Sequence, residues 1–464
     1  MSPRPSPSLF FKLITQVTLI AGSLAVSGCG SVSIGSAHPI QTLPTAWNTL
    51  DGNLPLVIGH RGLPGLYPEE TRMSYAQAAD AGADSLELDL HMTKDCVLVA
   101  RHNPWMSDNT NVAEVAKTNP IVAARKRIGT GVLRDVAYPN LPENGPAQYL
   151  TDVTNPNDPK SPLQALIVDG EAHINDWSIS DFTLAELKQW IGGTTYDARD
   201  ERPAEFNGKL PILTFQEVID IAKAKSVATG RVISTYPESK NPIWNNAQAI
   251  ANGCGVPGGH PFEDAILQVI VHNQLNHKNA PVFVQSFDPA SLKYLRSVGL
   301  ATKVVQLVDG NAVNFQTGET IFITPTPDTF VSGRPYSWTL AGDPRTFGVM
   351  LTPAGLAEVK TYADGIGIWK PEAMLHLIVP SNSAANKTGL AEVNLIKPST
   401  VINDAHKLGL FVHVFTFRNE AKYLAGLYKG DPIAEYIAFY RAGVDGVFSD
   451  FTPTALAARN AMLK

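Results

Sequence analysis

The sequence predicts an α/β fold of the (β/α)8 TIM-barrel type, and three observations favour it. Eight short runs of apolar and β-branched residues recur along the 464-residue chain. Helical patterns follow most of these runs, and repeated βα units of this number are typical of a closed parallel barrel. Polar residues come directly after several runs, at the strand ends where such a barrel carries its functional face.

The first 28 residues predict a targeting segment, which precedes the fold. A positively charged start leads into an apolar run, residues 13–26, that is too short and interrupted to favour a transmembrane helix. The sequence VSGC at residues 26–29 resembles a bacterial lipobox, so we expect cleavage before Cys29 and lipidation of this cysteine. An ordinary signal peptide with a chance cysteine is the alternative. Residues 29–53 are then a tether, and the protein is exported to a bacterial cell envelope or periplasm with lipid as its membrane anchor.

The first predicted strand, 55–59, is followed directly by the sequence HRG. A helix is expected to start within 67–71, where proline suits the first turn and acidic residues suit the positive helix end, and to stop near Gly82. A second strand, 84–90, leads through a turn into a return run at 97–101. This connection is too short for a helical crossover, so we expect a hairpin outside the parallel ladder.

Residues 103–230 fit the alternating pattern poorly and are interpreted as an insertion after the second strand that covers one face. Within it, helical signals occur at 181–188 and 213–224. Further strands are predicted at 232–236, 282–285, 303–307, 363–366, 411–416 and 445–448. Helices are predicted at 261–275, 289–298, 398–408 and 432–442. The segment 309–345 lacks this period and is a second loop excursion, so the barrel domain spans 54–464.

Composition limits the possible partners. The formal net charge is −6 and no basic stripe stands out, so nucleic acid is a poor candidate and a small-molecule substrate is expected. The three cysteines, Cys29, Cys96 and Cys254, form neither a disulfide framework nor a zinc motif. With Cys29 lipidated, the other two are free or bridged. The sequence decides neither this nor the oligomeric state.

Acidic residues at the strand ends indicate a cation site. Glu87 and Asp89 stand at i and i+2 on a strand, so their side chains point to the same face. Such a pair repels unless a cation joins it, and Ca²⁺ or Mg²⁺ prefers oxygen ligands. Glu238, in YPESK after the next barrel strand, could supply a third carboxylate. Taken alone, the pair also fits a solvated strand face with salt bridges.

Groups suited to proton transfer and phosphate binding accompany these carboxylates. His60 and His102 could act as general base and general acid. Arg61 offers a planar fork for phosphate, and Lys240 could be a second phosphate partner. Glu69 could orient Arg61, touch substrate or only favour a helix start. Candidates for further substrate contacts, each of which could also be a surface residue, are Gln285, Phe287 and Trp369.

Taken together, the motifs resemble the glycerophosphodiester phosphodiesterase family of phospholipase-C-like barrels, and its secreted or periplasmic branch most closely. The motifs are HRG, PE-x-T, GAD-x-x-E-x-D, TKD, YPESK, VQSFD, YADGIG and GVDGVFSDF, in this order from residue 56 to 451. The resemblance implies metal-dependent hydrolysis of glycerophosphodiesters to sn-glycerol 3-phosphate and an alcohol. It implies an acid–base pair, a divalent-cation site preferring Ca²⁺ over Mg²⁺, and two phosphate ligands. It assigns the acid–base roles to His60 and His102. The metal ligands would be Glu87, Asp89 and Glu238, and the phosphate ligands Arg61 and Lys240.

Two departures from the family pattern and three alternatives stay open. Asn103 follows His102 where the family usually has aspartate, which could shift the protonation of the histidine. Glu70 follows Glu69 where a polar uncharged residue or histidine is usual, which adds negative charge near the mouth. The alternatives are a related barrel acting on lysophospholipid or sphingomyelin, a glycoside hydrolase using Glu87 and Asp89, and a non-catalytic lipoprotein. Which histidine is the acid, and whether water or the glycerol 2-hydroxyl attacks first, are also open.

Overall fold

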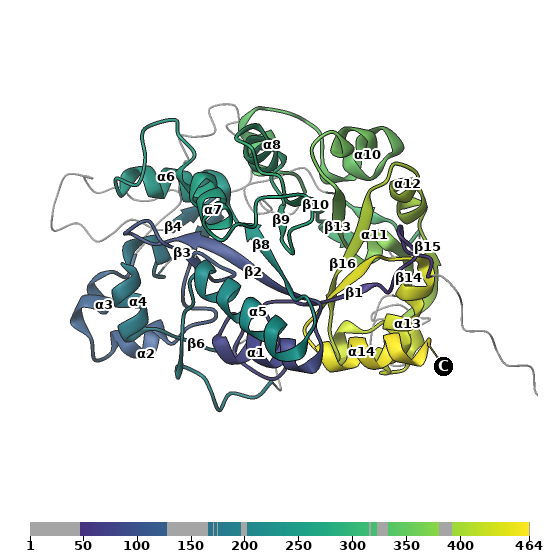
Figure 1. Cartoon of the computed structure of the whole chain (residues 1–464), viewed down its shortest axis with the longest axis horizontal. Helices are drawn as coiled ribbons and strands as arrows, with labels where there is room; N and C mark the ends of the chain where they lie inside the picture. Colours follow the sequence, from purple (N-terminus) through teal and green to yellow (C-terminus); the bar gives the residue numbers. More distant parts are fainter. Residues whose placement is uncertain are drawn as a thin grey trace, which may run out of the picture. The chain divides into compact units, whose positions relative to one another are not determined.

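A closed barrel of eight parallel strands forms the centre of the protein (Figure 1). The computed structural model describes residues 47–127, 166–169, 171–173, 175–195, 202–314, 317–322, 333–379 and 392–463. The barrel strands are β1 (Leu56–Gly59), β2 (Ser85–Met92), β8 (Ser234–Ser239), β9 (Phe283–Ser286), β10 (Lys303–Val308), β13 (Gly365–Trp369), β16 (Phe411–Phe417) and β17 (Gly446–Ser449). Sheet order follows chain order, and β1 pairs with both β2 and β17. The predicted TIM barrel is confirmed.

A helix lies between each pair of neighbouring barrel strands, as parallel connections require. These helices are α1 (Arg72–Ala81), α5 (Phe215–Thr229), α7 (Pro261–His272), α8 (Pro289–Ser297), α10 (Pro353–Lys360), α12 (Val401–Lys407) and α13 (Pro432–Ala442), and α14 (Thr452–Ala461) follows the last strand. The pattern did not predict α10, α14 or α6 (Pro242–Ala251), which precedes α7.

The expected start of the first helix is wrong. Thr71 is the N-cap of α1, and its hydroxyl accepts a hydrogen bond from the Ser74 amide. Glu69 and Glu70 therefore precede the helix and are not part of its first turn. Their side chains instead contact residues outside this helix.

The predicted hairpin is confirmed. β3 (Leu98–Ala100) runs antiparallel to β2, and the Arg101 amide donates to the Asp89 carbonyl at 2.9 Å. The return strand therefore brings His102 back to the level of the carboxylates on β2. In the turn, Cys96 forms a disulfide with Cys254, which answers the question that the sequence left open.

Removing this disulfide is expected to lower the free energy of unfolding by about 2–4 kcal/mol, because the bridge constrains a long loop in the unfolded chain. The two cysteines are 158 residues apart. Denaturant titration of the wild type and of Cys96→Ser/Cys254→Ser measures the difference, and the wild type treated with reductant should match the variant. Equal midpoints for all three samples would contradict the prediction.

The insertion forms a second, smaller core together with Val99 of β3 and Trp244 of α6, and Figure 1 shows α2, α3 and α4 gathered beside β3. Its described elements are α2 (Val112–Ala116), α3 (Pro120–Ala124), β4 (Leu166–Val168), β5 (Glu171–His173), α4 (Leu184–Trp190), β6 (Gly192–Gly193) and β7 (Leu210–Pro211). The predicted boundary at residue 230 is wrong, because α5 is the crossover helix to β8 and packs on α1 and β8. The insertion therefore ends before α5.

Further excursions also leave the carboxyl ends of barrel strands. The predicted one at 309–345 contains β11 (Ala312–Val313), β12 (Thr320–Ile321) and α9 (Tyr336–Leu340). After β13, the short helix α11 (Lys370–Ala373) leads into an unpredicted antiparallel hairpin, β14 (Met374–Val379) and β15 (Glu392–Pro398). These segments extend the functional face of the barrel.

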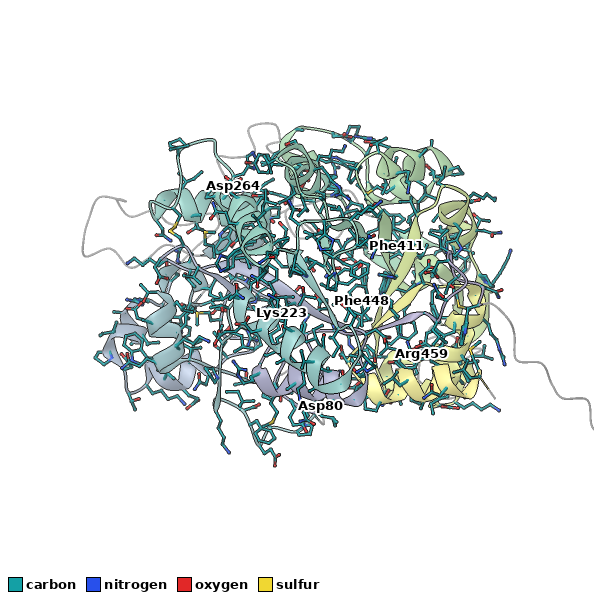
Figure 2. The ribbon with its side chains drawn as sticks, viewed as in Figure 1. Asp80, Lys223, Asp264, Phe411, Phe448 and Arg459 are labelled. Carbon is teal, nitrogen blue, oxygen red and sulfur yellow. A yellow bond between two sulfur atoms is a disulfide. The ribbon has the colours of Figure 1, made fainter. Side chains whose placement is uncertain are left out.

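An apolar cluster fills the barrel below this face. It contains Ile58, Tyr236, Phe283, Val305 and Phe448, with Phe411 packed against it; Phe411 and Phe448 are labelled in Figure 2. Side chains two residues apart on a strand point the same way. The next inward positions are therefore one layer nearer the strand ends, and they carry the polar residues His60, Glu238, Gln285 and Asp450.

The described end of the predicted tether belongs to the folded domain. The Trp47 ring meets the Tyr440 ring edge-on at 6.3 Å, and the Leu50 amide donates to Asp445 Oδ1 at 2.6 Å. The prediction that residues 47–53 are tether is therefore wrong. The rest of the tether, the targeting segment and Cys29 lie outside the described residues.

Across the part of the chain that the structure describes, the helices are all too short or too polar to span a bilayer.

Candidate active site

A cavity of about 810 Å³ opens at the carboxyl ends of the barrel strands. It brings together ten of the predicted site residues: His60, Arg61, Glu87, Asp89, His102, Glu238, Lys240, Gln285, Phe287 and Trp369. Glu69 lies behind this lining and contacts Arg61, with Arg61 Nη1 donating to Glu69 Oε2 at 3.2 Å. The excursions after the strands supply most of the remaining wall.

Three buried carboxylates converge on the cavity floor. Asp89 and Glu238 are register partners on β2 and β8, and each of Glu87, Asp89 and Glu238 offers a carboxylate oxygen within 4.8 Å of the others. Burial, followed by the Asp89 charge, raises the pKa of Glu87 well above its usual range. Burial also raises the pKa of Glu238 to about 8. An all-oxygen donor set that is this crowded and buried fits a hard divalent cation.

Two cationic side chains flank the carboxylates. Arg61 Nε lies 3.0 Å from Asp89 Oδ2, while Lys240 Nζ lies 3.5 Å from Glu238 Oε1 and 3.8 Å from Asp89 Oδ1. Burial would raise the pKa of Asp89, but the charges of Arg61 and Lys240 outweigh it and lower that pKa. Both cationic groups face the cavity, where they can contact a phosphate beside the carboxylate cluster.

Glu70 lies behind the site and does not add charge at its mouth as the sequence suggested. It is fully buried with φ of 57°, and its Oε1 accepts a hydrogen bond from the Asp89 amide at 2.7 Å. Arg101 Nε lies 3.9 Å from the other Glu70 oxygen. Glu70 therefore fixes the backbone of a candidate metal ligand, which explains why this residue precedes α1.

His60 is held by a carboxylate that the sequence analysis assigned no role. His60 Nδ1 lies 2.6 Å from Asp450 Oδ1. Asp450 Oδ2 accepts hydrogen bonds from Arg202 Nη2 at 2.7 Å and from Arg418 Nε at 3.1 Å. Burial would raise the pKa of Asp450, but His60 and the two arginines outweigh it and hold that pKa well below its usual range. The ionised Asp450 accepts the proton of His60 Nδ1, which leaves Nε2 as the acceptor of a neutral ring. Burial and the Arg61 charge lower the pKa of His60 to about 4, so the ring is neutral at pH 7.

His102 lines the cavity and its backbone is fixed from behind. The Asn245 amide donates to His91 Nδ1 at 3.0 Å, so His91 Nε2–H donates to the His102 carbonyl at 3.2 Å. Asn103, which departs from the family pattern, donates from Nδ2 to Asp108 Oδ2 at 2.8 Å. The acidic group near this position is therefore Asp108, and Asn103 binds it.

Gln285 and Glu69, both predicted to contact substrate, support neighbouring site residues. Gln285 Nε2 donates to Glu87 Oε1 at 3.1 Å, and the Arg61 amide donates to Glu87 Oε2 at 2.8 Å. Glu69 accepts from Arg61 and, through Oε1, from Asn109 Nδ2 at 2.9 Å. These contacts orient a carboxylate and a guanidinium that face the cavity.

Phe287 and Trp369 form apolar parts of the wall. The Phe287 ring centre lies 5.9 Å from Lys240 Nζ, within the range of a cation–π contact. Trp369 ends β13, and its amide donates to Glu372 Oε2 at 3.0 Å, which fixes the start of α11. Both rings can pack against the carbon part of a bound molecule.

Five residues of the site were not predicted from the sequence: Asp450, Arg202, Arg418, His91 and Asn245. Asp450 had a usable signal, because it stands directly after the last barrel strand, where the other site residues also stand. No sequence spacing points from Arg202 to its partner Asp450, which is 248 residues away.

The chain is similar to known proteins of one family. The model of the glycerophosphoryl diester phosphodiesterase family matches residues 60–327, more than half of the chain. A glycerophosphodiester phosphodiesterase from Arabidopsis thaliana is 28% identical over 457 residues, covering 95% of each chain. One from Haemophilus influenzae is 25% identical over 462 residues, covering 96% of this chain and 97% of the relative. A solved phosphodiesterase from Oleispira antarctica, in complex with its product sn-glycerol-3-phosphate, matches at a TM-score of 0.46 and 15% identity, covering 89% of this chain and 99% of that one.

Proposed function

Because the chain belongs to the glycerophosphoryl diester phosphodiesterase family, we propose that it hydrolyses glycerophosphodiesters to sn-glycerol 3-phosphate and an alcohol, using a divalent cation and two histidines. One observation carries this mechanism: groups at the ends of β1, β2, β3 and β8 line one cavity. They include an acid–base pair, three carboxylates and two phosphate-binding cations. A glycoside hydrolase would leave both histidines and both cations without a task.

The carboxylates of Glu87, Asp89 and Glu238 would hold the cation. Their crowding and burial support a divalent ion, and we propose Ca²⁺ first and Mg²⁺ second. When bound, the ion neutralises phosphate oxygens and makes the attacking hydroxyl more acidic. Glu70 and Gln285 keep two of the three ligands in place through the contacts described above.

Each histidine would then carry out one of the two proton transfers. His60 presents Nε2 as a proton acceptor, because Asp450 occupies Nδ1, and this supports His60 as the general base. His102, on the return strand of the hairpin, would protonate the leaving oxygen. Arg61 and Lys240 would bind the phosphate and stabilise its developing charge. The hydroxyl that loses its proton to His60 is either water or the 2-hydroxyl of the glycerol, which would give a cyclic intermediate.

A substrate panel tests this proposal. Glycerophosphocholine and glycerophosphoethanolamine are expected to release sn-glycerol 3-phosphate, measured by a coupled dehydrogenase assay. Lysophosphatidylcholine and sphingomyelin are expected to react far more slowly, since each adds a long acyl chain to the molecule that the cavity must hold. Turnover of the acylated substrates alone would favour the related phospholipase-like activity, and turnover of none would favour a non-catalytic protein.

We also propose export to a bacterial cell envelope with a lipid anchor on Cys29. The lipobox-like VSGC at residues 26–29 supports it. Wild-type protein is expected in the membrane fraction, and Cys29→Ser is expected to move it out, because acyl chains contribute roughly 0.8 kcal/mol per buried CH₂. Cys96→Ser/Cys254→Ser, which removes the other two cysteines, should leave partitioning unchanged. Equal membrane fractions for wild type and Cys29→Ser would contradict lipidation.

A further inference from the structure

Arg202 connects the inserted segment to the centre of the site. It lies between β6 and β7, yet its side chain is only 4% exposed. Its Nη2 donates to Asp450 Oδ2 at 2.7 Å, its Nε donates to Glu420 Oε1 at 2.6 Å, and its guanidinium stacks 5.4 Å from the centre of the Phe451 ring. One side chain of the insertion therefore contacts the loops after the last two barrel strands.

Described residues on both sides of the loop that carries Arg202 are bonded to each other. The Thr195 amide donates to Asn207 Oδ1 at 2.8 Å, which joins the two sides of the loop. A Cβ at Gly193 would lie 2.9 Å from Thr71 Cγ2 and 3.2 Å from Arg101 Nη1, so β6 packs closely on the residues behind the carboxylates. Thr195 Oγ1 also donates to the Pro203 carbonyl at 2.8 Å, so the residue next to Arg202 is bonded to the end of this packed segment.

The Asp450 carboxylate depends on such a partner. It is 1% exposed, and a buried carboxylate stays ionised only when paired. Its Oδ1 is used by His60, and its Oδ2 is shared by Arg202 and Arg418. With donors on both oxygens, the carboxylate plane is fixed. Without Arg202, Oδ2 keeps only the longer hydrogen bond from Arg418 Nε at 3.1 Å, so the carboxylate can rotate and change the direction of the His60 hydrogen bond.

We propose that Arg202 is a positioning residue, through which the docked insertion sets the orientation and tautomer of His60. Arg202 holds Asp450 Oδ2, so that Oδ1 accepts the proton of His60 Nδ1 and Nε2 stays directed at the cavity. A guanidinium suits this task because its fork bonds Asp450 and Glu420 at once, which a lysine ammonium does not reproduce. The kinetic part of the proposal rests on the role of His60 in the proposed function.

A double-mutant cycle tests the proposal on the full, metal-loaded enzyme. Arg202→Met is expected to lower kcat by about 10²-fold, the cost of a small misplacement of a catalytic group, with KM changed little. Asp450→Asn is expected to cost at least as much, and adding Arg202→Met to it should cost nothing further, because Arg202 acts through Asp450. Arg202→Lys should recover part of the loss. Arg127→Met is the matched control, since it removes a two-point ion pair with Asp181 in the same insertion and should keep the wild-type kcat.

Two kinetic outcomes would overturn the proposal: a wild-type kcat in folded Arg202→Met, or multiplicative losses in the double variant. If Arg202→Met does not fold, the same cycle is run with Arg202→Lys, and the same outcomes decide. A second readout is independent of turnover. In ¹⁵N-histidine-labelled protein, His60 should show the pure Nδ1–H tautomer, and Arg202→Met should mix the two tautomers. If the wild type hydrolyses no glycerophosphodiester, the proposed function fails, whereas an unchanged His60 tautomer in Arg202→Met refutes the positioning role.

Discussion

His60→Ala and His102→Ala each lower kcat by about 10²–10⁴-fold, the contribution expected of a positioned general base or acid. The reason is geometric: the two histidines line one cavity from β1 and from the return strand of the hairpin. Because neither residue is proposed to bind the ground-state phosphate, KM should change far less than kcat. Steady-state kinetics with glycerophosphocholine measure both constants.

Folding and chemistry must be separated in this experiment, because His60→Ala leaves Asp450 without its Nδ1 partner. His60→Gln keeps a hydrogen-bond donor near Asp450 and should be equally inactive while unfolding at a similar temperature. His277→Ala replaces an exposed histidine and should behave as wild type. Near-normal rates in folded His60 or His102 variants would remove them from the acid–base roles.

Removing divalent cations with EDTA is expected to abolish turnover, and added Ca²⁺ or Mg²⁺ should restore it. Carboxylate oxygens of Glu87, Asp89 and Glu238 lie within 4.8 Å of one another, and burial raises the pKa of Glu87 and of Glu238. Carboxylates this close repel one another when ionised, and a divalent cation bound between them would relieve that repulsion. Thermal unfolding supplies a readout besides activity, since an ion at 100 times its Kd stabilises the folded state by about 2.7 kcal/mol.

Matched variants sharpen the metal experiment. Glu238→Gln should weaken both the ion-dependent stabilisation and the activity. Glu263→Gln changes another buried glutamate, which bonds Asn246 in the helical layer, and should keep the ion dependence of the wild type. Full activity in the presence of chelator, together with a melting temperature that does not change when the ion is added, would refute the cation site.

Local patterns predict the barrel well, for a physical reason. A parallel strand covered on both faces is an uninterrupted apolar run, and its polar end marks the functional face. Leu56–Gly59, followed by His60 and Arg61, illustrates this relation. The candidate carboxylates and cations could be listed from the sequence because they stand at such ends.

Tertiary contacts account for what the sequence did not predict. The first helix starts after Glu70 because Thr71 caps it, and the Glu70 carboxylate instead accepts a hydrogen bond from the distant Asp89 amide. The insertion boundary was misplaced because the helix that follows it belongs to the barrel crossover. Asp450 and Arg202 meet across 248 residues, and no periodicity or motif spacing carries such a pairing.

The pairing of the first barrel strand with the last has a consequence for how activity arises during synthesis and refolding. Leu56 pairs with Gly446, so His60 meets Asp450 only after almost the whole chain has emerged and the ring has closed. Contacts between such distant residues form late and slowly, because they carry a high entropic cost of loop closure. A nascent or C-terminally truncated chain therefore lacks an oriented base, and recovery of turnover during refolding reports ring closure itself.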